Sequence, residues 1–204
     1  LISSQPKLKC EYAAELISSL GYNILESGDN LGYALFNERI TQFSPPKKGL
    51  SSFPEFIDVL SQADNYGGGC NIKLALDFAL ESINEGSLVI IVSDFIGLTT
   101  GWERSIEHAA SKFNLMGIMI NDPIERKIPE GQGQMAIEDP LSGKRMLIEP
   151  NIIKPFFEVE VKRIEHTIRS VFMDHGADFT LLQTDTDFIG KIIELFQARM
   201  AKWK

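Results

Sequence analysis

The sequence predicts an α/β fold, a doubly wound and mostly parallel sheet with helices on both of its faces. Short apolar runs alternate along the chain with longer amphipathic stretches, and the connections between them are short. This alternation is typical of right-handed βαβ units. One run, Leu88–Val92, is continuously apolar and mostly β-branched, as expected of a central strand buried on both faces. The length of 204 residues suits a single domain, residues 1–204.

The first part of the chain predicts one helix and two strands. Apolar residues at helical spacing predict a helix over Lys9–Leu25, which ends at a Ser-Gly-Asp-Asn run. The apolar run Leu31–Phe36 predicts a buried strand, and Arg39–Phe43 predicts its partner after a tight turn. Because proline has no N–H to donate to a β ladder, we expect Pro45–Gly49 to be a loop.

The middle of the chain predicts two helices around a glycine-rich turn, followed by the clearest strand. The helix over Ser52–Ala63 has a proline in its first turn, where the missing N–H costs little. Asn65–Asn71 contains three successive glycines and predicts the turn that opens a helix over Ile72–Ile83. The strand that follows is Ser87–Asp94.

The second half continues the alternation, with one interruption. Met135–Glu138 and Arg145–Ile148 flank a turn that contains proline and glycine, and they predict a β-hairpin insertion at about 124–150. The other predicted elements are helices over Trp102–Lys112, Ile152–His175 and Phe188–Trp203, and strands over Leu115–Ile120 and Asp178–Gln183.

Charge and composition exclude several classes of function. Twenty Lys and Arg against 28 Asp and Glu give a net charge of −8, so the chain lacks the basic surface that binds nucleic acid or anionic lipid. No apolar run approaches the roughly 20 residues of a membrane span. Two cysteines are too few for a disulfide framework, which favours the cytoplasm. The chain opens at Leu1 without Met, at what reads as the end of a strand, so we expect it to be part of a longer chain.

Polar side chains follow several of the predicted strands, at the edge where ligands bind in open parallel sheets. Asp94 is the sharpest candidate, because a carboxylate that ends a buried strand offers the oxygen ligands that Mg²⁺ prefers. The same residue also reads as a helix N-cap or a satisfied carboxylate at the edge. Asp122 follows another strand, whereas Asp185 and Asp187 precede a helix whose dipole favours acidic residues.

No catalytic constellation stands out, and we expect the protein not to be an enzyme. His108, His166 and His175 fall within predicted helices or at a helix end, far in sequence from Cys70, which has no partner base. The triple glycine lacks the Lys and Ser/Thr of a Walker loop, and no early strand is followed by a dinucleotide fingerprint.

A series of segments in a fixed order carries a family resemblance. These segments are Lys9–Ala13, Gly28–Phe36, Pro45–Gly49, Gly67–Asn71, Val92–Phe95, Asp122–Pro129 and Thr184–Phe188. Together they resemble the von Willebrand factor A-like domain of the bacterial domain-of-unknown-function family 58, over nearly the whole chain. The resemblance implies a Rossmann-type sheet and a metal-ion-dependent adhesion site at its carboxyl edge.

In that site, as the resemblance implies, an Asp-x-Ser-x-Ser loop, a threonine and a further aspartate hold Mg²⁺, which bridges to a carboxylate of a partner protein. Asp94 matches the further aspartate, Cys70 stands in place of the threonine, and Ser3 matches the first serine. Leu1 and Gln5 fall where the loop's aspartate and second serine belong. Because a thiol suits Mg²⁺ poorly, we expect a degenerate site that binds Mg²⁺ weakly or not at all.

These observations favour a non-enzymatic protein–protein interaction module. The resemblance implies an adaptor that works with a MoxR-type AAA+ ATPase. An alternative is an Mg²⁺-dependent phosphoryl-transfer or nuclease-like enzyme that uses Asp94, Asp122 and Asp185, although the net charge of −8 disfavours it. A third hypothesis, compatible with the first, is a structural subunit that docks a neighbour through residues 124–150.

Overall fold

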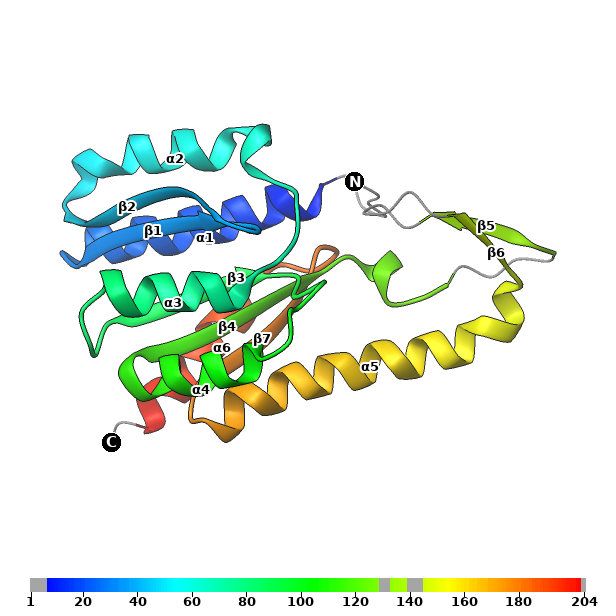
Figure 1. Cartoon of the computed structure of the whole chain (residues 1–204). Coiled ribbons are helices and arrows are strands. Elements are labelled where there is room, and N and C mark those ends of the chain that lie inside the picture. The colour runs from blue at the N-terminus through cyan, green and yellow to red at the C-terminus, as the bar shows by residue number, and fades with distance from the viewer. Residues whose placement is uncertain (1–6, 129–132, 139–144, 203–204) are drawn as a thin grey trace.

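A parallel three-stranded sheet, flanked by helices, forms the centre of the molecule (Figure 1). The computed structural model describes residues 7–128, 133–138 and 145–202. The strands β3 (Leu88–Ser93), β4 (Asn114–Asn121) and β7 (Asp178–Gln183) pair in the order β3-β4-β7. The predicted α/β class, with a parallel sheet between helices, is therefore confirmed.

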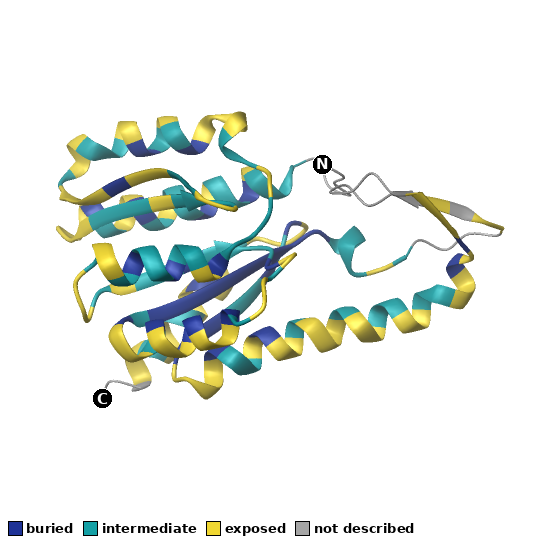
Figure 2. Ribbon diagram, viewed as in Figure 1, coloured by how far each residue is buried: buried dark blue, intermediate teal, exposed yellow. Residues whose placement is uncertain are grey.

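The middle strand β4 is buried along nearly its whole length (Figure 2). Its alternating side chains belong to two separate cores. Leu115 and Met119 join one cluster, and Met116 and Ile118 join the other. Because successive side chains of a strand point to opposite faces, this division shows that each face of the sheet is covered.

Different helices cover the two faces of the sheet. The first core contains side chains of three helices, and the second is formed against two others. The helices of the first core are α3 (Ile72–Ser82), α4 (Trp102–Lys112) and α5 (Pro150–Asp174). Those of the second are α1 (Lys9–Glu26) and α6 (Ile189–Lys202). The predicted helix end at Trp203 lies outside the described residues.

Two strands near the N-terminus form a hairpin of their own, which differs from the single sheet we predicted. β1 (Asn30–Phe36) pairs antiparallel with β2 (Ile40–Lys48), and within the described part of the chain no ladder joins them to β3. The strand expected to end at Leu1–Ser3 falls outside the described residues. The helix α2 (Phe53–Ser61) packs on α1 beside this hairpin.

The predicted loop at Pro45–Gly49 is wrong, because β2 continues through both prolines to Lys48. The ladder changes register between Leu31 and Tyr33, opposite these prolines. Such an irregularity removes the need for proline to donate an N–H, and prolines in sheets occur at bulges and edges for this reason. Gly32 allows the close approach, because a Cβ there would lie 2.8 Å from the nitrogen of Pro46.

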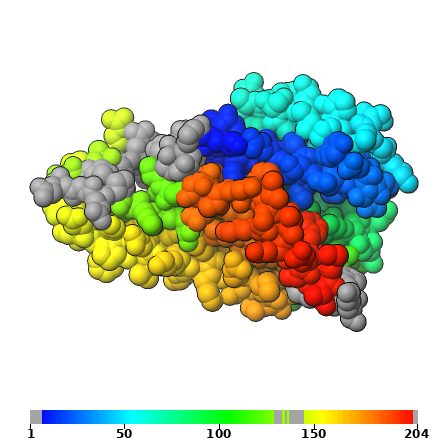
Figure 3. All heavy atoms as spheres, turned by 180° about the vertical axis from the view of Figure 1, so that it is seen from behind, coloured from blue at the N-terminus to red at the C-terminus, as the bar shows by residue number. Residues whose placement is uncertain are grey.

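The last part of the fold projects from the body, and we call it the arm. It comprises β5 (Met135–Glu138), β6 (Arg145–Ile148) and the first half of α5, residues 150–163. β5 and β6 pair antiparallel over the bounds predicted from the sequence, whereas the turn expected at 139–143 lies outside the described residues. Figure 3 shows the yellow N-terminal half of α5 extending beyond the body.

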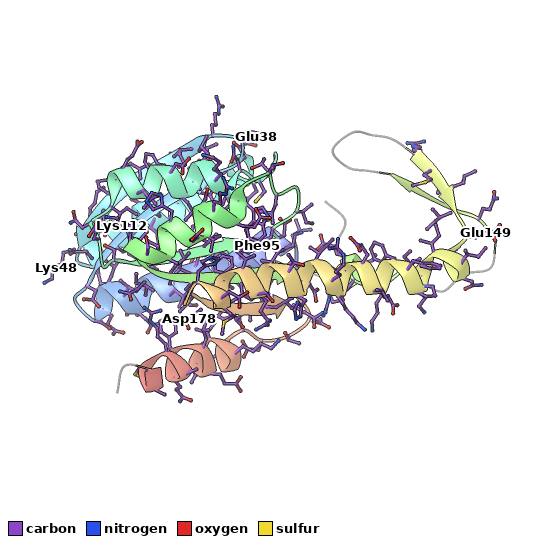
Figure 4. All side chains as sticks on the ribbon, turned by 60° about the horizontal axis from the view of Figure 1, so that its bottom comes forward. Glu38, Lys48, Phe95, Lys112, Glu149 and Asp178 are labelled. Atoms are coloured by element: carbon purple, nitrogen blue, oxygen red, sulfur yellow. The ribbon has the colours of Figure 1, made fainter. Side chains whose placement is uncertain are left out.

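Only the second half of α5 contributes to the core. Ile168 and Phe172 are almost fully buried, whereas most of the side chains that precede them are exposed or half-buried. Figure 4 accordingly shows Glu149 at the far end of α5 and Phe95 within the body. Among the described residues, no helix is long and apolar enough to cross a membrane.

Gly117 is a sensitive point of this core. A Cβ at this position would lie 2.7 Å from Phe172 and 2.9 Å from Phe179, two packed rings with little room to move. We expect Gly117→Ala to lower the free energy of unfolding by about 1–3 kcal/mol, as overpacking does elsewhere. Urea denaturation measures the loss.

The control is Gly190→Ala in α6, where nothing lies within 4 Å of the added Cβ. It should leave stability unchanged or slightly raised, since alanine favours helix over glycine. Equal losses in the two variants would contradict the close packing at Gly117.

Candidate functional site

The carboxyl ends of the three parallel strands carry a group of polar side chains, as the sequence predicts. β3 ends at Ser93 and is followed by Asp94, and β4 is followed by Asp122. Thr184 comes directly after β7, and its hydroxyl donates to Asp122 Oδ2 at 3.3 Å. This edge is the candidate site, because open parallel sheets bind ligands at the carboxyl ends of their strands.

A lysine connects the carboxylates of this edge. Lys9 is the first residue of α1, and its ammonium donates to Asp94 Oδ2 at 2.7 Å and to Glu125 Oε1 at 2.6 Å. Glu125 belongs to the 3-10 helix η3 (Pro123–Glu125), which follows β4. The three side chains are between 20% and 30% exposed, so water screens their attraction only in part.

The ammonium of Lys9 stays charged in this position. Burial by itself lowers the pKa of Lys9, but the hydrogen bonds and charges of Asp94 and Glu125 outweigh it, and the net shift is upward. A cation held between two carboxylates is thus a permanent feature of the edge at neutral pH.

The turn after β3 fixes Asp94 by hydrogen bonds of its own. Asp94 Oδ1 accepts from the Ile96 N–H at 3.1 Å, and Ser93 Oγ accepts from the Phe95 N–H at 3.0 Å. Phe95 adopts φ 56°, a left-handed conformation that a bulky residue rarely takes. Its buried ring packs against Phe172, with ring centroids 5.8 Å apart, and this packing holds the strained turn.

Asp94 therefore has the contacts of a satisfied carboxylate at the sheet edge, one of the two ordinary readings left open by the sequence. It accepts from Lys9 on one oxygen and from the backbone on the other. Both of its carboxylate oxygens are therefore engaged by the chain itself.

The thiol of Cys70 lies next to the side chain of Ser93, the last residue of β3. The distance from Cys70 Sγ to Ser93 Oγ is 3.4 Å. The pKa of the Cys70 thiol is raised, chiefly by burial. The contact with Ser93 lowers it in part, and the charge of Asp94 adds to the rise. The preceding turn is pinned to the β1–β2 connection, because Glu38 Oε1 accepts from the Gly69 N–H at 2.6 Å.

Asp122 is the most buried carboxylate of the edge, and both of its oxygens accept hydrogen bonds from other residues of the chain. It is 1% exposed, and its Oδ1 accepts from the Ile124 N–H at 3.0 Å while Oδ2 accepts from Thr184. Its own N–H donates to Glu125 Oε2 at 3.0 Å. Glu125 therefore links Lys9 to the start of η3.

Asp185 and Asp187 lie further out, as their place before a helix predicts. Both are exposed, and Asp187 Oδ1 accepts from the Ile189 N–H at the start of α6. This is the contact of a helix cap. The same loop is fixed to α1 by the Tyr12 hydroxyl, which donates to the Thr186 carbonyl at 3.0 Å.

The described donors do not fit Mg²⁺, which requires about six oxygen ligands. Cys70 offers a sulfur, and Asp94 already binds an ammonium. Ser3, the third expected ligand, lies outside the described residues. Over residues 7–128, 133–138 and 145–202, no group of three or more His, Cys, Asp and Glu converges as a metal site.

Sequence reasoning missed Lys9 and Glu125 as members of this edge. Both lie in segments that carry the family resemblance, Lys9–Ala13 and Asp122–Pro129. Their separations from the partners they meet are 85 residues for Lys9–Asp94 and 116 for Lys9–Glu125. A single sequence carries no signal for such long-range ion pairs. The one local hint is that Lys9 begins a helix, where the helix dipole disfavours a positive charge unless an acidic group lies nearby.

A comparison with known protein families shows to which of them the chain belongs. The profile described as "Protein of unknown function DUF58" matches residues 2–167. The chain belongs to this family. No curated protein matches it.

Two solved structures share the fold of this DUF58 protein. The conserved hypothetical protein BatB from Bacteroides thetaiotaomicron is 19% identical, with a TM-score of 0.64 over 95% of this chain and 88% of that one. An aerotolerance-related membrane protein from Bacteroides fragilis NCTC 9343, with multiple mutations to serines, is 15% identical, with a TM-score of 0.62 over 92% and 86%. At these identities the likeness concerns the fold alone.

Asp122 should matter for stability. In Asp122→Ala the Ile124 N–H and the Thr184 hydroxyl lose their acceptor in a buried place, which costs about 1–3 kcal/mol of the free energy of unfolding. Asp185→Ala removes an exposed carboxylate of the same edge and should change stability by less than about 0.5 kcal/mol. Urea unfolding of both variants tests this, and a stable Asp122→Ala would refute the assigned contacts.

Tyr12 should make stability depend on pH in alkaline solution. Burial raises the pKa of Tyr12 to about 12, whereas a tyrosine of the unfolded chain ionises at about 10. The corresponding stability is fully present below pH 10 and is lost as the pH rises towards 12. Tyr12→Phe should flatten this fall, as measured by urea unfolding at about pH 9 and about pH 11. If the free energy of unfolding falls equally in both proteins between these pH values, Tyr12 is not the cause of the fall.

Proposed function

We propose that this protein is a non-enzymatic protein–protein interaction module, and that the arm is its docking surface. The observation that carries the proposal is a set of large apolar side chains on the arm, between 60% and 74% exposed. They are Met146, Leu147, Ile152, Phe156 and Val159, and we call them the arm patch. Large apolar side chains that gather on one exposed part of a protein often mark an interaction surface.

The spacing of the arm patch supports a surface made for contact. Ile152, Phe156 and Val159 are separated by four and three residues, so they lie along one side of α5. The core-facing residues of the same helix, such as Ile168 and Phe172, come later and are buried. The arm patch is thus additional to the side chains that stabilise the fold, and it exposes a phenylalanine, a residue type enriched at interfaces.

The base of the arm is held firmly against the sheet edge. Glu165 Oε1 accepts from the Asn121 side-chain amide at 3.0 Å, and Glu165 Oε2 accepts from Arg126 at 2.7 Å. Glu165 is only 12% exposed. A rigid base limits the conformational entropy that binding would cost.

We propose further that the domain is von Willebrand factor A-like, with residues 124–150 as a hairpin insertion, and that the partner is a MoxR-type AAA+ ATPase in the cytoplasm. The parallel order β3-β4-β7, with Asp94 after β3, supports the first part. The family membership supports the second only through the resemblance described above.

The carboxylates that an Mg²⁺-dependent enzyme would need have other contacts. Asp94 binds Lys9, Asp122 accepts from Ile124 and Thr184, and Asp185 lies further out and exposed. Two-metal chemistry needs such groups clustered around the ions. This arrangement is our reason for preferring an interaction module.

Phe156→Asp should weaken binding to a purified MoxR-type AAA+ ATPase of the same organism by about tenfold or more, since a buried aromatic anchor at an interface is worth at least that. Because Phe156 is 74% exposed, the variant should unfold like the unsubstituted chain. Biolayer interferometry measures the affinity, and thermal unfolding measures the stability.

Met173→Asp is the matched control, since Met173 is an exposed apolar residue of the same helix, outside the arm. It should bind as the unsubstituted chain does. Equal binding by all three proteins would refute the arm as the docking surface, and no binding by any of them would refute the ATPase as the partner.

A further inference from the structure

We propose that the Lys9 ammonium is the resident cation of the sheet edge, held between Asp94 and Glu125, and that this edge works without Mg²⁺. The inference concerns the edge itself and does not depend on the arm or on its partner. It replaces the metal-bridged contact that the family resemblance implies.

The hydrogen bonds of the two carboxylates carry the argument. Each of their four oxygens already accepts from the protein. Lys9 donates to Asp94 Oδ2 and Glu125 Oε1, the Ile96 N–H donates to Asp94 Oδ1, and the Asp122 N–H donates to Glu125 Oε2. An incoming ion would have to displace the ammonium and disturb backbone hydrogen bonds of two turns.

Two neighbouring side chains among the described residues, Ser93 and Cys70, would not replace for Mg²⁺ the contacts that it loses by this displacement. Ser93 Oγ accepts from the Phe95 N–H and lies 3.4 Å from the Cys70 thiol. A thiol is a soft ligand that Mg²⁺ does not favour, and Mg²⁺ gives up its own water reluctantly. Lys9 suffers no such loss, because its ammonium is already in contact with both carboxylates.

The covalent attachment of Lys9 gives it a further advantage over a free ion. The chain itself delivers this cation to the edge, so its occupancy does not vary with the concentration of Mg²⁺ in solution. Lys9 also joins α1 to the turn after β3 and to η3, so it performs the structural task that a metal performs in bridging loops.

The first experiment uses the unsubstituted chain. Its thermal midpoint should be the same, within about 1 °C, in millimolar MgCl₂ and in EDTA, because a ligand that does not bind the folded state cannot stabilise it. The electron paramagnetic resonance signal of free Mn²⁺ should also be unchanged by the protein. A midpoint that rises with MgCl₂, or a loss of free Mn²⁺ that Asp94→Asn abolishes, overturns the proposal.

The second experiment removes the cation. Lys9→Met removes the ammonium that Asp94 and Glu125 bind, and its thermal midpoint should fall by about 4 °C. MgCl₂ should restore part of this loss in Lys9→Met only. Lys9→Arg keeps the charge and should show neither the full loss nor the response to MgCl₂.

Lys73→Met is the matched control, because Lys73 pairs with Asp77 on the exposed surface of α3. The thermal midpoint of Lys73→Met should shift by less than about 1 °C, and MgCl₂ should not change it. If Lys9→Met has the same midpoint as Lys73→Met, Lys9 is not the cation that holds this edge. If Lys9→Met does not fold, the Mn²⁺ measurement on the unsubstituted chain still decides the question.

Discussion

The contact of one ammonium with two carboxylates joins helix α1 to the segments that follow β3 and β4. Lys9 begins α1, Asp94 follows β3, and Glu125 lies in η3, so one side chain fixes the helix and two loops at the sheet edge. Charges in a partly buried place are costly unless paired and hydrogen-bonded. Here each carboxylate oxygen of Asp94 and Glu125 has a donor. These hydrogen bonds hold α1, the turn after β3 and η3 in place around the edge.

The residue after Glu125 leads from this contact to the base of the arm. Glu125 lies next to Arg126, whose guanidinium binds Glu165 of α5, and Glu165 also accepts from Asn121 at the end of β4. Beneath this layer, Phe95, Phe172 and Phe179 pack against one another. The polar layer sets the direction of α5, and the aromatic layer holds its second half on the sheet.

The sequence predicts the order of the elements well, because hydrophobic period and turn residues are local signals. β5, β6 and β7 have the predicted bounds, and Asp94 follows β3 as expected. The extension of β2 through Pro45 and Pro46 was not predictable, since it depends on a register shift opposite Leu31 and Tyr33. The partner of Asp94 was equally hidden, because Lys9 reaches it only when α1 packs on the folded sheet.

The length of α5 also separates the exposed residues of its first half from the buried residues of its second half. The helix rises about 1.5 Å per residue, so Phe156 lies about 18 Å along its axis from Ile168. At such a separation, changes at the two ends of a helix are energetically independent as a rule. Exposed residues of the arm can therefore be substituted while the side chains of α5 that pack on the sheet stay the same. In the proposed function, recognition and folding are carried by different lengths of one helix.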